Sequence, residues 1–121
     1  MVAKLKVLCV DDNPDAVQSV GDLLHLAGCQ VMGCQDGATA LSVAEDFGPD
    51  VCLLDLTMPG MDGLELATRL RDLAGDRPVR LVALTGRWDP DSHHATHNLR
   101  FDRHLVKPCD PRRLVEAVTG R

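Results

Sequence analysis

The sequence contains few aromatic residues and no tyrosine, since Phe47, Trp88 and Phe101 are the three rings among 121 residues. Surfaces that bind nucleic-acid bases by stacking depend on such rings. Basic residues are also in the minority, because 13 lysines and arginines face 18 aspartates and glutamates, for a net charge of −5. A protein dedicated to nucleic acid needs a basic face, so we expect no direct nucleic-acid partner.

Long apolar runs are missing as well. No segment approaches the roughly 20 apolar residues that cross a bilayer, and the N-terminus lacks a signal-peptide pattern. The five cysteines are an odd number and include no C-x-x-C pair. We therefore expect reduced thiols that serve as small buried hydrophobic groups, in a cytoplasmic protein with no membrane partner. Cys29 and Cys34 would lie on opposite faces of an extended strand, which disfavours a disulfide between them.

Short apolar runs alternate with amphipathic stretches along the whole chain. We predict strands at 6–10, 30–33, 51–54, 80–84 and 104–106, each followed by a helix. The helix starts are predicted from cap and proline signals at Asn13-Pro14, Asp36-Gly37, Asp62, Asp89-Pro90 and Asp110-Pro111. The fourth helix is the weakest, because Ala95 is the only apolar residue in 91–98. Five strand–helix repeats predict one α/β domain over 1–121, a doubly wound parallel sheet with helices on both faces.

Aspartate supplies 15 of the 18 acidic residues, and most of these have a place at a cap, a turn or an exposed helix position. Asp11, Asp12 and Asp55 have no such place, and they follow the first and third predicted strands. The carboxyl ends of neighbouring parallel strands meet where α/β sheets bind ligands. A capping turn explains 11–13 equally well when that stretch is taken alone. The three carboxylates together favour a Mg²⁺ site, because clustered like charges need a cation or raised pKa values.

Two further strands end at polar residues that point to the same site. Thr85 closes the fourth predicted strand, and Lys107, one of only three lysines, follows the fifth. A compact ammonium group suits a point contact to carboxylate or phosphate. Pro108 makes the bond before it the best candidate for a cis peptide. The set indicates phosphoryl transfer, in which Asp55 attacks, Mg²⁺ neutralises charge, and Thr85 and Lys107 hold phosphoryl oxygens.

Four stretches carry a family resemblance: VDDN (10–13), LLDLTMPGMDG (53–63), ALTG (83–86) and FDRHLVKP (101–108). Over essentially its whole length, the sequence resembles a two-component response-regulator receiver domain of the CheY-like type. Each motif is weak alone, but five functional positions at the expected strand ends are highly specific. The resemblance implies a flavodoxin-like fold, with five parallel strands in the order 2-1-3-4-5 flanked by five helices.

The resemblance also implies a phosphorelay chemistry. Asp55 would accept a phosphoryl group from the phosphohistidine of a sensor histidine kinase or phosphotransfer protein. Asp12, Asp55 and the backbone carbonyl of Thr57 would ligate Mg²⁺, and Asp11 would act through water. Thr85 would then move toward the phosphate, and Lys107 would pair with it. The protein would not be an enzyme for a separate substrate, since it would catalyse only its own phosphorylation and dephosphorylation.

The switch implied by the resemblance involves the fourth helix, fifth strand and fifth helix, whose surface would control a partner or output domain. His104 stands where the family usually has an aromatic ring that moves with the threonine, so we predict Thr85 and His104 as switch residues. The other histidine cluster is His93, His94 and His97. Only His93 and His97 share a helical face, and no third ligand is in register with them, so we expect a solvated face and not a metal site.

Other functions fit the motifs less well. An aspartyl-phosphate phosphatase would carry a D-x-D motif after the first strand, and a flavin or dinucleotide module would carry a phosphate-cradling loop there. The sequence has neither. A receiver that acts only as a protein-interaction module stays open. Two origins also stay open, a stand-alone regulator and a receiver from a hybrid histidine kinase or larger regulator.

Overall fold

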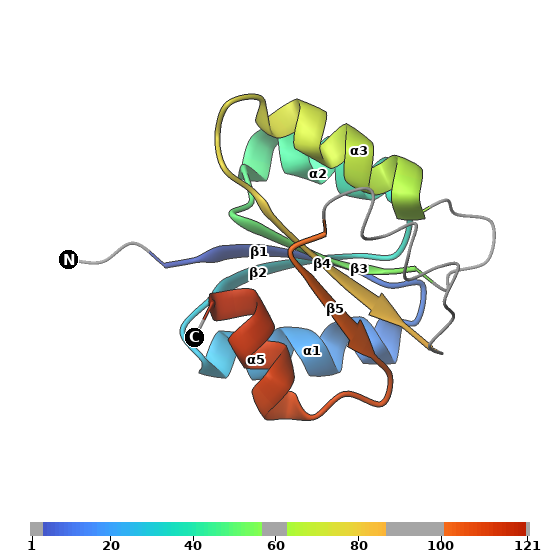
Figure 1. Cartoon of the computed structure of the whole chain (residues 1–121), viewed down its shortest axis with the longest axis vertical. Helices are drawn as coiled ribbons and strands as arrows, with labels where there is room; N and C mark the ends of the chain where they lie inside the picture. Colours follow the sequence, from blue (N-terminus) through green and yellow to red (C-terminus); the bar gives the residue numbers. More distant parts are fainter. Residues whose placement is uncertain (1–3, 57–62, 87–100, 121) are drawn as a thin grey trace.

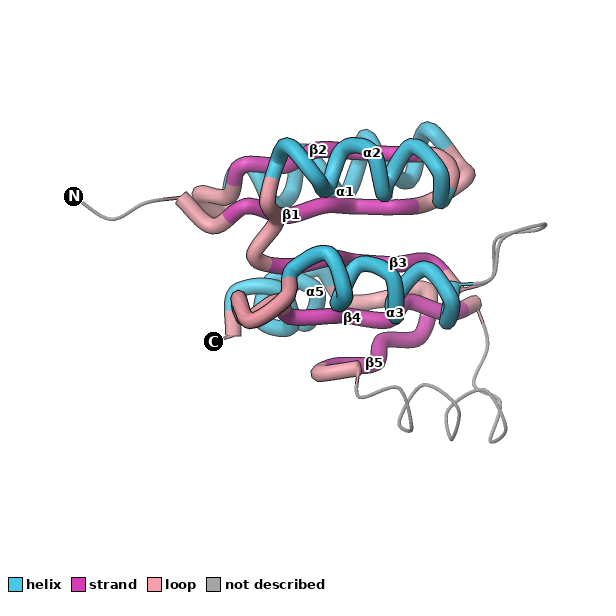
Figure 2. The backbone as a smooth tube through the Cα atoms, turned by 90° about the horizontal axis from the view of Figure 1, so that it is seen from above, coloured by secondary structure: helices cyan, strands magenta, loops and turns pink. Residues whose placement is uncertain are grey.

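The structure, a computed structural model, describes residues 4–56, 63–86 and 101–120. The elements in this part of the chain are β1 (Lys6–Val10), α1 (Pro14–Leu26), β2 (Gln30–Cys34), α2 (Gly37–Phe47), β3 (Val51–Asp55), α3 (Gly63–Ala74), β4 (Arg80–Thr85), β5 (Arg103–Val106) and α5 (Pro111–Thr119). All strands are parallel and follow the order β2-β1-β3-β4-β5 (Figure 2). The predicted fold class and strand order are confirmed.

The sheet separates two hydrophobic cores. Helices α2 and α3 cover one face, and α1 and α5 cover the other (Figure 1). Leu8, Leu54 and Leu81 belong to the first core, whereas Val7, Leu53 and Val82 belong to the second. Successive residues of a strand point to opposite faces, so each central strand supplies both cores. Continuous apolar runs in β1, β3 and β4 are the consequence of this double burial.

The two edge strands, β2 and β5, are less buried than the three central strands. In β2, Cys34 is buried, whereas Met32 is 41% exposed, and in β5 Val106 is 38% exposed. Each edge strand has a neighbour on one side only, so the helix layers cover it incompletely. Gly33 of β2 allows α1 to approach closely, since a Cβ atom there would lie 2.3 Å from Cγ1 of Val17.

The helix boundaries follow the predicted caps wherever the structure describes them. Asn13 caps α1, with its side chain accepting from the Asp15 N–H, and Asp36 caps α2 by accepting from the Thr39 N–H. Asp110 caps α5 in the same way. The apolar side chains of α1 are mostly half-buried, as Val17 and Val20 show. Only Leu24 is fully buried, because α1 packs toward the partly covered edge of the sheet.

The described cysteines behave as small hydrophobic side chains, as predicted. All five are free, four are buried, and Cys109 is half-buried. Cys29 and Cys34 lie in different cores, which confirms that they do not form a disulfide. Burial raises the pKa of the thiols of Cys9 and Cys52 to about 12. These two thiols are therefore protonated at neutral pH and are poor nucleophiles.

Several predictions fall on residues outside the described ranges. The helix expected after Asp89-Pro90 and the histidines at 93, 94 and 97 belong to this group, as do Asp62 and the backbone carbonyl of Thr57. Among the helices that the structure does describe, none is long and apolar enough to cross a membrane.

Candidate functional site

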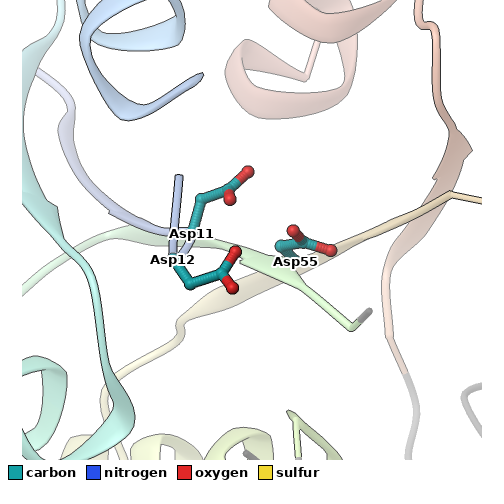
Figure 3. Close-up of side chains that lie close together, drawn as sticks. All are labelled: Asp11, Asp12 and Asp55. Atoms are coloured by element: carbon teal, nitrogen blue, oxygen red, sulfur yellow. The ribbon is translucent and has the colours of Figure 1, made fainter. Parts of the chain in front are cut away.

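Three aspartates predicted to form a site meet at the carboxyl ends of β1 and β3. Asp11 and Asp12 follow β1 directly, and Asp55 is the last residue of β3. Because β1 and β3 are paired neighbours, their ends place the three carboxylates together (Figure 3). One carboxylate oxygen from each lies within 4.8 Å of the others. Asp11 and Asp55 are 4% exposed, whereas Asp12 is exposed, so the cluster opens to solvent on the Asp12 side.

Lys107 supplies a positive charge to this cluster. It follows β5 directly, and its Nζ atom lies 3.1 Å from Oδ2 of Asp11 and 3.0 Å from Oδ2 of Asp55. Burial lowers the pKa of Lys107, but its hydrogen bonds to Asp55 and Asp11 more than offset this, so the pKa lies above its usual value. The ammonium group is thus charged at neutral pH and bridges two buried carboxylates.

Asp11 is held from two directions. Its Oδ1 atom accepts a hydrogen bond from the backbone N–H of Asn13 at 3.0 Å, and its Oδ2 atom faces Lys107. Burial raises the pKa of Asp11 above its ordinary value, although both of these contacts act in the opposite direction. The nearby charge of Asp55 also raises it. The cost of two adjacent buried carboxylates is therefore only partly compensated by one lysine.

The sequence identified Asn13 as a helix cap, and the structure gives this residue a second contact with the site. Its side chain caps α1, while its backbone N–H fixes the orientation of Asp11. Sequence patterns can indicate the cap but not the second bond, because every residue type except proline offers a backbone N–H.

Thr85 lies on β4 and His104 on β5, the two strands that follow β3 in the order of the sheet. Thr85 is the last residue of β4 and is 5% exposed, and its carbonyl accepts from the N–H of Lys107 at 2.7 Å. His104 is a half-buried residue of β5, in register with Ala83 of β4. The peptide bond between Lys107 and Pro108 is cis. The structure thus brings Thr85 next to the backbone of Lys107, and it places His104 on β5, with β4 between it and the strand that ends at Asp55.

The chemistry of the donor set fits a divalent cation of the Mg²⁺ type. Every side-chain donor in the cluster is a carboxylate oxygen, which is the ligand that hard cations prefer. The cluster has three carboxylates, and Lys107 contributes one positive charge to it. The remaining negative charge would favour a bound cation. The described residues therefore include side chains suited to a small metal site that is exposed to solvent at Asp12.

One residue near β5 was not indicated by the sequence. Asp102 directly precedes this strand, and its Oδ2 atom accepts from the backbone N–H of Leu81 at 2.8 Å. Its own N–H donates to the carbonyl of Leu81, also at 2.8 Å. An aspartate before a short strand is the only sequence signal for such a contact, and it resembles an ordinary turn.

Comparison with known proteins identifies the family. The family model of the response regulator receiver domain matches residues 7–119. The transcriptional regulatory protein PrrA of Mycobacterium tuberculosis is 38% identical over 117 residues, which cover 97% of this chain and 49% of that protein. The sensor histidine kinase GacS of Pseudomonas protegens is 33% identical over 116 residues, covering 93% of this chain and 13% of GacS. This chain thus spans half or less of the length of these two relatives.

The solved structures agree with the sequence matches. The chemotaxis protein CheY4 of Vibrio cholerae superposes with a TM-score of 0.88 at 30% identity, and the match covers 98% of each chain. The strand order β2-β1-β3-β4-β5 is thus that of a CheY-like domain. On these grounds the chain belongs to the response regulator receiver domains of two-component systems, a family of phosphoacceptor signalling domains.

Proposed function

We propose that this chain receives a phosphoryl group on Asp55 in a Mg²⁺-dependent phosphorelay. The observation that carries the proposal is the contact of Lys107 with Asp55 at 3.0 Å, inside a cluster of three carboxylates. Such an arrangement combines a nucleophilic carboxylate, oxygen ligands for a cation and a separate cation for a phosphoryl oxygen.

The donor would be the phosphohistidine of a sensor histidine kinase or a phosphotransfer protein. A carboxylate oxygen of Asp55 forms a bond to phosphorus while the nitrogen–phosphorus bond breaks, and the imidazole leaves with the bonding electron pair. Lys107 then exchanges its contact with the Asp55 carboxylate for one with a phosphoryl oxygen. The hydroxyl of Thr85 holds a second phosphoryl oxygen.

Asp12, Asp55 and the carbonyl of Thr57 would hold Mg²⁺, with Asp11 acting through water. Once bound, Mg²⁺ supplies positive charge that offsets the carboxylates and the phosphoryl oxygens. The hydrogen bond from the Asn13 N–H to Asp11 fixes the orientation of the Asp11 carboxylate, which also contacts Lys107. In the same phosphoacceptor role the chain would catalyse its own phosphorylation and dephosphorylation, with no separate substrate.

The signal would leave the site through β5. Phosphorylation adds roughly −1.5 to −2 charge at the pocket, and Thr85 and His104 respond as the switch residues. The surface of β5, α5 and the helix predicted after Asp89 then controls a partner or an output domain. The shift cannot exceed the difference in free energy with which the phosphate stabilises the two states. We further propose that 1–121 is a single cytoplasmic receiver domain without direct contact to nucleic acid or membrane.

A labelling experiment tests the proposed function. The protein is incubated with acetyl phosphate and Mg²⁺, and the intact mass is measured. We expect a gain of one phosphoryl group in the wild type and in Asp46→Asn, a matched exposed aspartate of α2. Asp55→Asn should gain none. Labelling that is absent from the wild type would contradict the proposal and favour a pure interaction module. Labelling that persists in Asp55→Asn would also contradict it, because the phosphoryl group would then be on another residue.

A further inference from the structure

Lys107 directly follows β5, an edge strand of only four residues. β5 (Arg103–Val106) pairs with β4 alone, and Lys107 follows its last residue. At this end the Lys107 N–H donates to the carbonyl of Thr85 at 2.7 Å. The position of the Lys107 ammonium relative to Asp55 therefore depends on how β5 is aligned along β4.

Asp102 fixes the other end of β5 through two bonds to one residue. Its backbone N–H donates to the carbonyl of Leu81, and its Oδ2 atom accepts from the Leu81 N–H, each at 2.8 Å. In a parallel ladder the N–H of Leu81 would donate to a backbone carbonyl of the next strand. The carboxylate takes the place of that carbonyl. Leu81 is 0% exposed, so a change of Asp102 removes the carboxylate partner of the N–H of a buried residue.

We propose that Asp102 is a positioning residue that fixes the register of β5 and thereby holds Lys107 against Asp55 and Asp11. The proposal rests on the function proposed above, since it gives Lys107 its role in phosphoryl transfer. A second contact of Asp102, with Nη2 of Arg71 on α3, is longer, at 3.9 Å, and both side chains are more than 40% exposed. An exposed pair at this distance contributes little. The hydrogen bond to Leu81 carries the positioning.

Three variants separate these contacts. Asp102→Ala removes both the acceptor and the charge, Asp102→Asn keeps an acceptor oxygen without the charge, and Arg71→Ala removes the ion pair with Asp102 but keeps the Asp102 carboxylate. The first readout is the ¹⁵N signal of the Lys107 ammonium in protein labelled at lysine, which gives only three signals. The second readout is the rate of Asp55 labelling by acetyl phosphate with Mg²⁺. Lys107→Ala, alone and combined with Asp102→Ala, completes the set.

In Asp102→Ala, we expect the Lys107 signal to move toward that of the exposed Lys4, and labelling to slow by about five-fold or more. Asp102→Asn and Arg71→Ala should behave like the wild type. In the Lys107→Ala background, Asp102→Ala should have no further effect beyond about two-fold. If Asp102→Ala does not fold, Asp102→Glu moves the carboxylate away from Leu81 and serves as the same test.

Two results would overturn the proposal. The first is an unchanged Lys107 signal in Asp102→Ala. The second is an equal loss in Asp102→Ala and Asp102→Asn, which would assign the effect to charge and not to the hydrogen bond. A wild type that is not labelled at all would contradict the phosphoacceptor function instead. The ammonium signal would still test the positioning in that case, because it is observed without phosphorylation.

Discussion

The Nζ atom of Lys107 lies 3.0 Å from Oδ2 of Asp55, although 52 residues separate them in the chain. The fold produces this contact by ending β3 and β5 at the same edge of one parallel sheet. Asp11 joins them from the end of β1 and accepts from the same ammonium at 3.1 Å. Three strand ends thus combine into one charged cluster, in which Lys107 contacts two of the three carboxylates.

Loss of the Lys107 ammonium should destabilise the fold when Mg²⁺ is absent. Lys107→Ala removes the ammonium group that contacts Asp11 and Asp55, two aspartates that are each only 4% exposed in the wild type. We expect the free energy of unfolding to fall by about 1–2 kcal/mol, less than for a fully buried pair, because a third of the Lys107 side chain is exposed. Urea denaturation at neutral pH measures this, with Lys4→Ala as the exposed control. Equal stability of Lys107→Ala and wild type would contradict the role of Lys107.

Removal of the Asp12 carboxylate should weaken Mg²⁺ binding with little effect on stability. Asp12 is the exposed member of the cluster, so Asp12→Asn removes a proposed metal ligand from the surface of the cluster. We expect Mg²⁺ affinity to drop by roughly ten-fold or more, measured by calorimetry. Asp15→Asn, which changes an exposed aspartate of the first turn of α1, should leave the affinity unchanged. If both variants bind Mg²⁺ equally, Asp12 is not a ligand.

The cap at Asp36 predicts a pH dependence of stability. Hydrogen bonds from the backbone N–H and the hydroxyl of Thr39 hold the pKa of Asp36 below its ordinary value of 3.8. A depressed pKa means that the ionised carboxylate stabilises the fold fully above pH 3.8. This contribution is lost as the pH falls through the folded-state pKa. The difference in urea midpoint between wild type and Asp36→Ala should therefore narrow below pH 3.8. A constant difference would contradict the cap.

Packing of α1 against β2 depends on the missing side chain of Gly33. A Cβ atom there would lie 2.3 Å from Cγ1 of Val17, so Gly33→Ala should destabilise by about 1–3 kcal/mol. Val17→Ala in the same chain should recover part of this loss by removing the clash. Gly21→Ala is the matched control, because its Cβ would have an ordinary 3.9 Å contact, and alanine favours the helix by about 0.5–1 kcal/mol. Thermal unfolding of the four proteins distinguishes these effects.

Most of the fold could be predicted because local and long-range signals agree in this sequence. Apolar runs locate the strands, and Asn13-Pro14 and Asp110-Pro111 locate two helix starts that the structure places at the same residues. Exposure was predicted less well, since β2 and β5 are edge strands and nothing in their composition reveals the missing neighbour.

The members of the site were predictable because strand ends of one parallel sheet converge. Asp11, Asp12 and Asp55 could be identified as aspartates without a cap or turn, and Lys107 as a scarce lysine at a strand end. The contacts between them depend on geometry that sequence does not carry. The Asn13 N–H donates to the Asp11 carboxylate and the Leu81 N–H donates to the Asp102 carboxylate, and these donors are backbone groups that every residue type except proline offers.

The central claim is that Asp55, and neither of its two acidic neighbours, carries the phosphoryl group. The most direct measurement treats the protein with acetyl phosphate and Mg²⁺ and reduces it with borohydride, which converts an aspartyl phosphate to homoserine. The position of the homoserine is then found by peptide mass spectrometry. We expect homoserine at position 55 and unchanged aspartate at Asp11 and Asp12. Homoserine at either of those positions, or at none, would contradict the assignment of Asp55 as the phosphoacceptor.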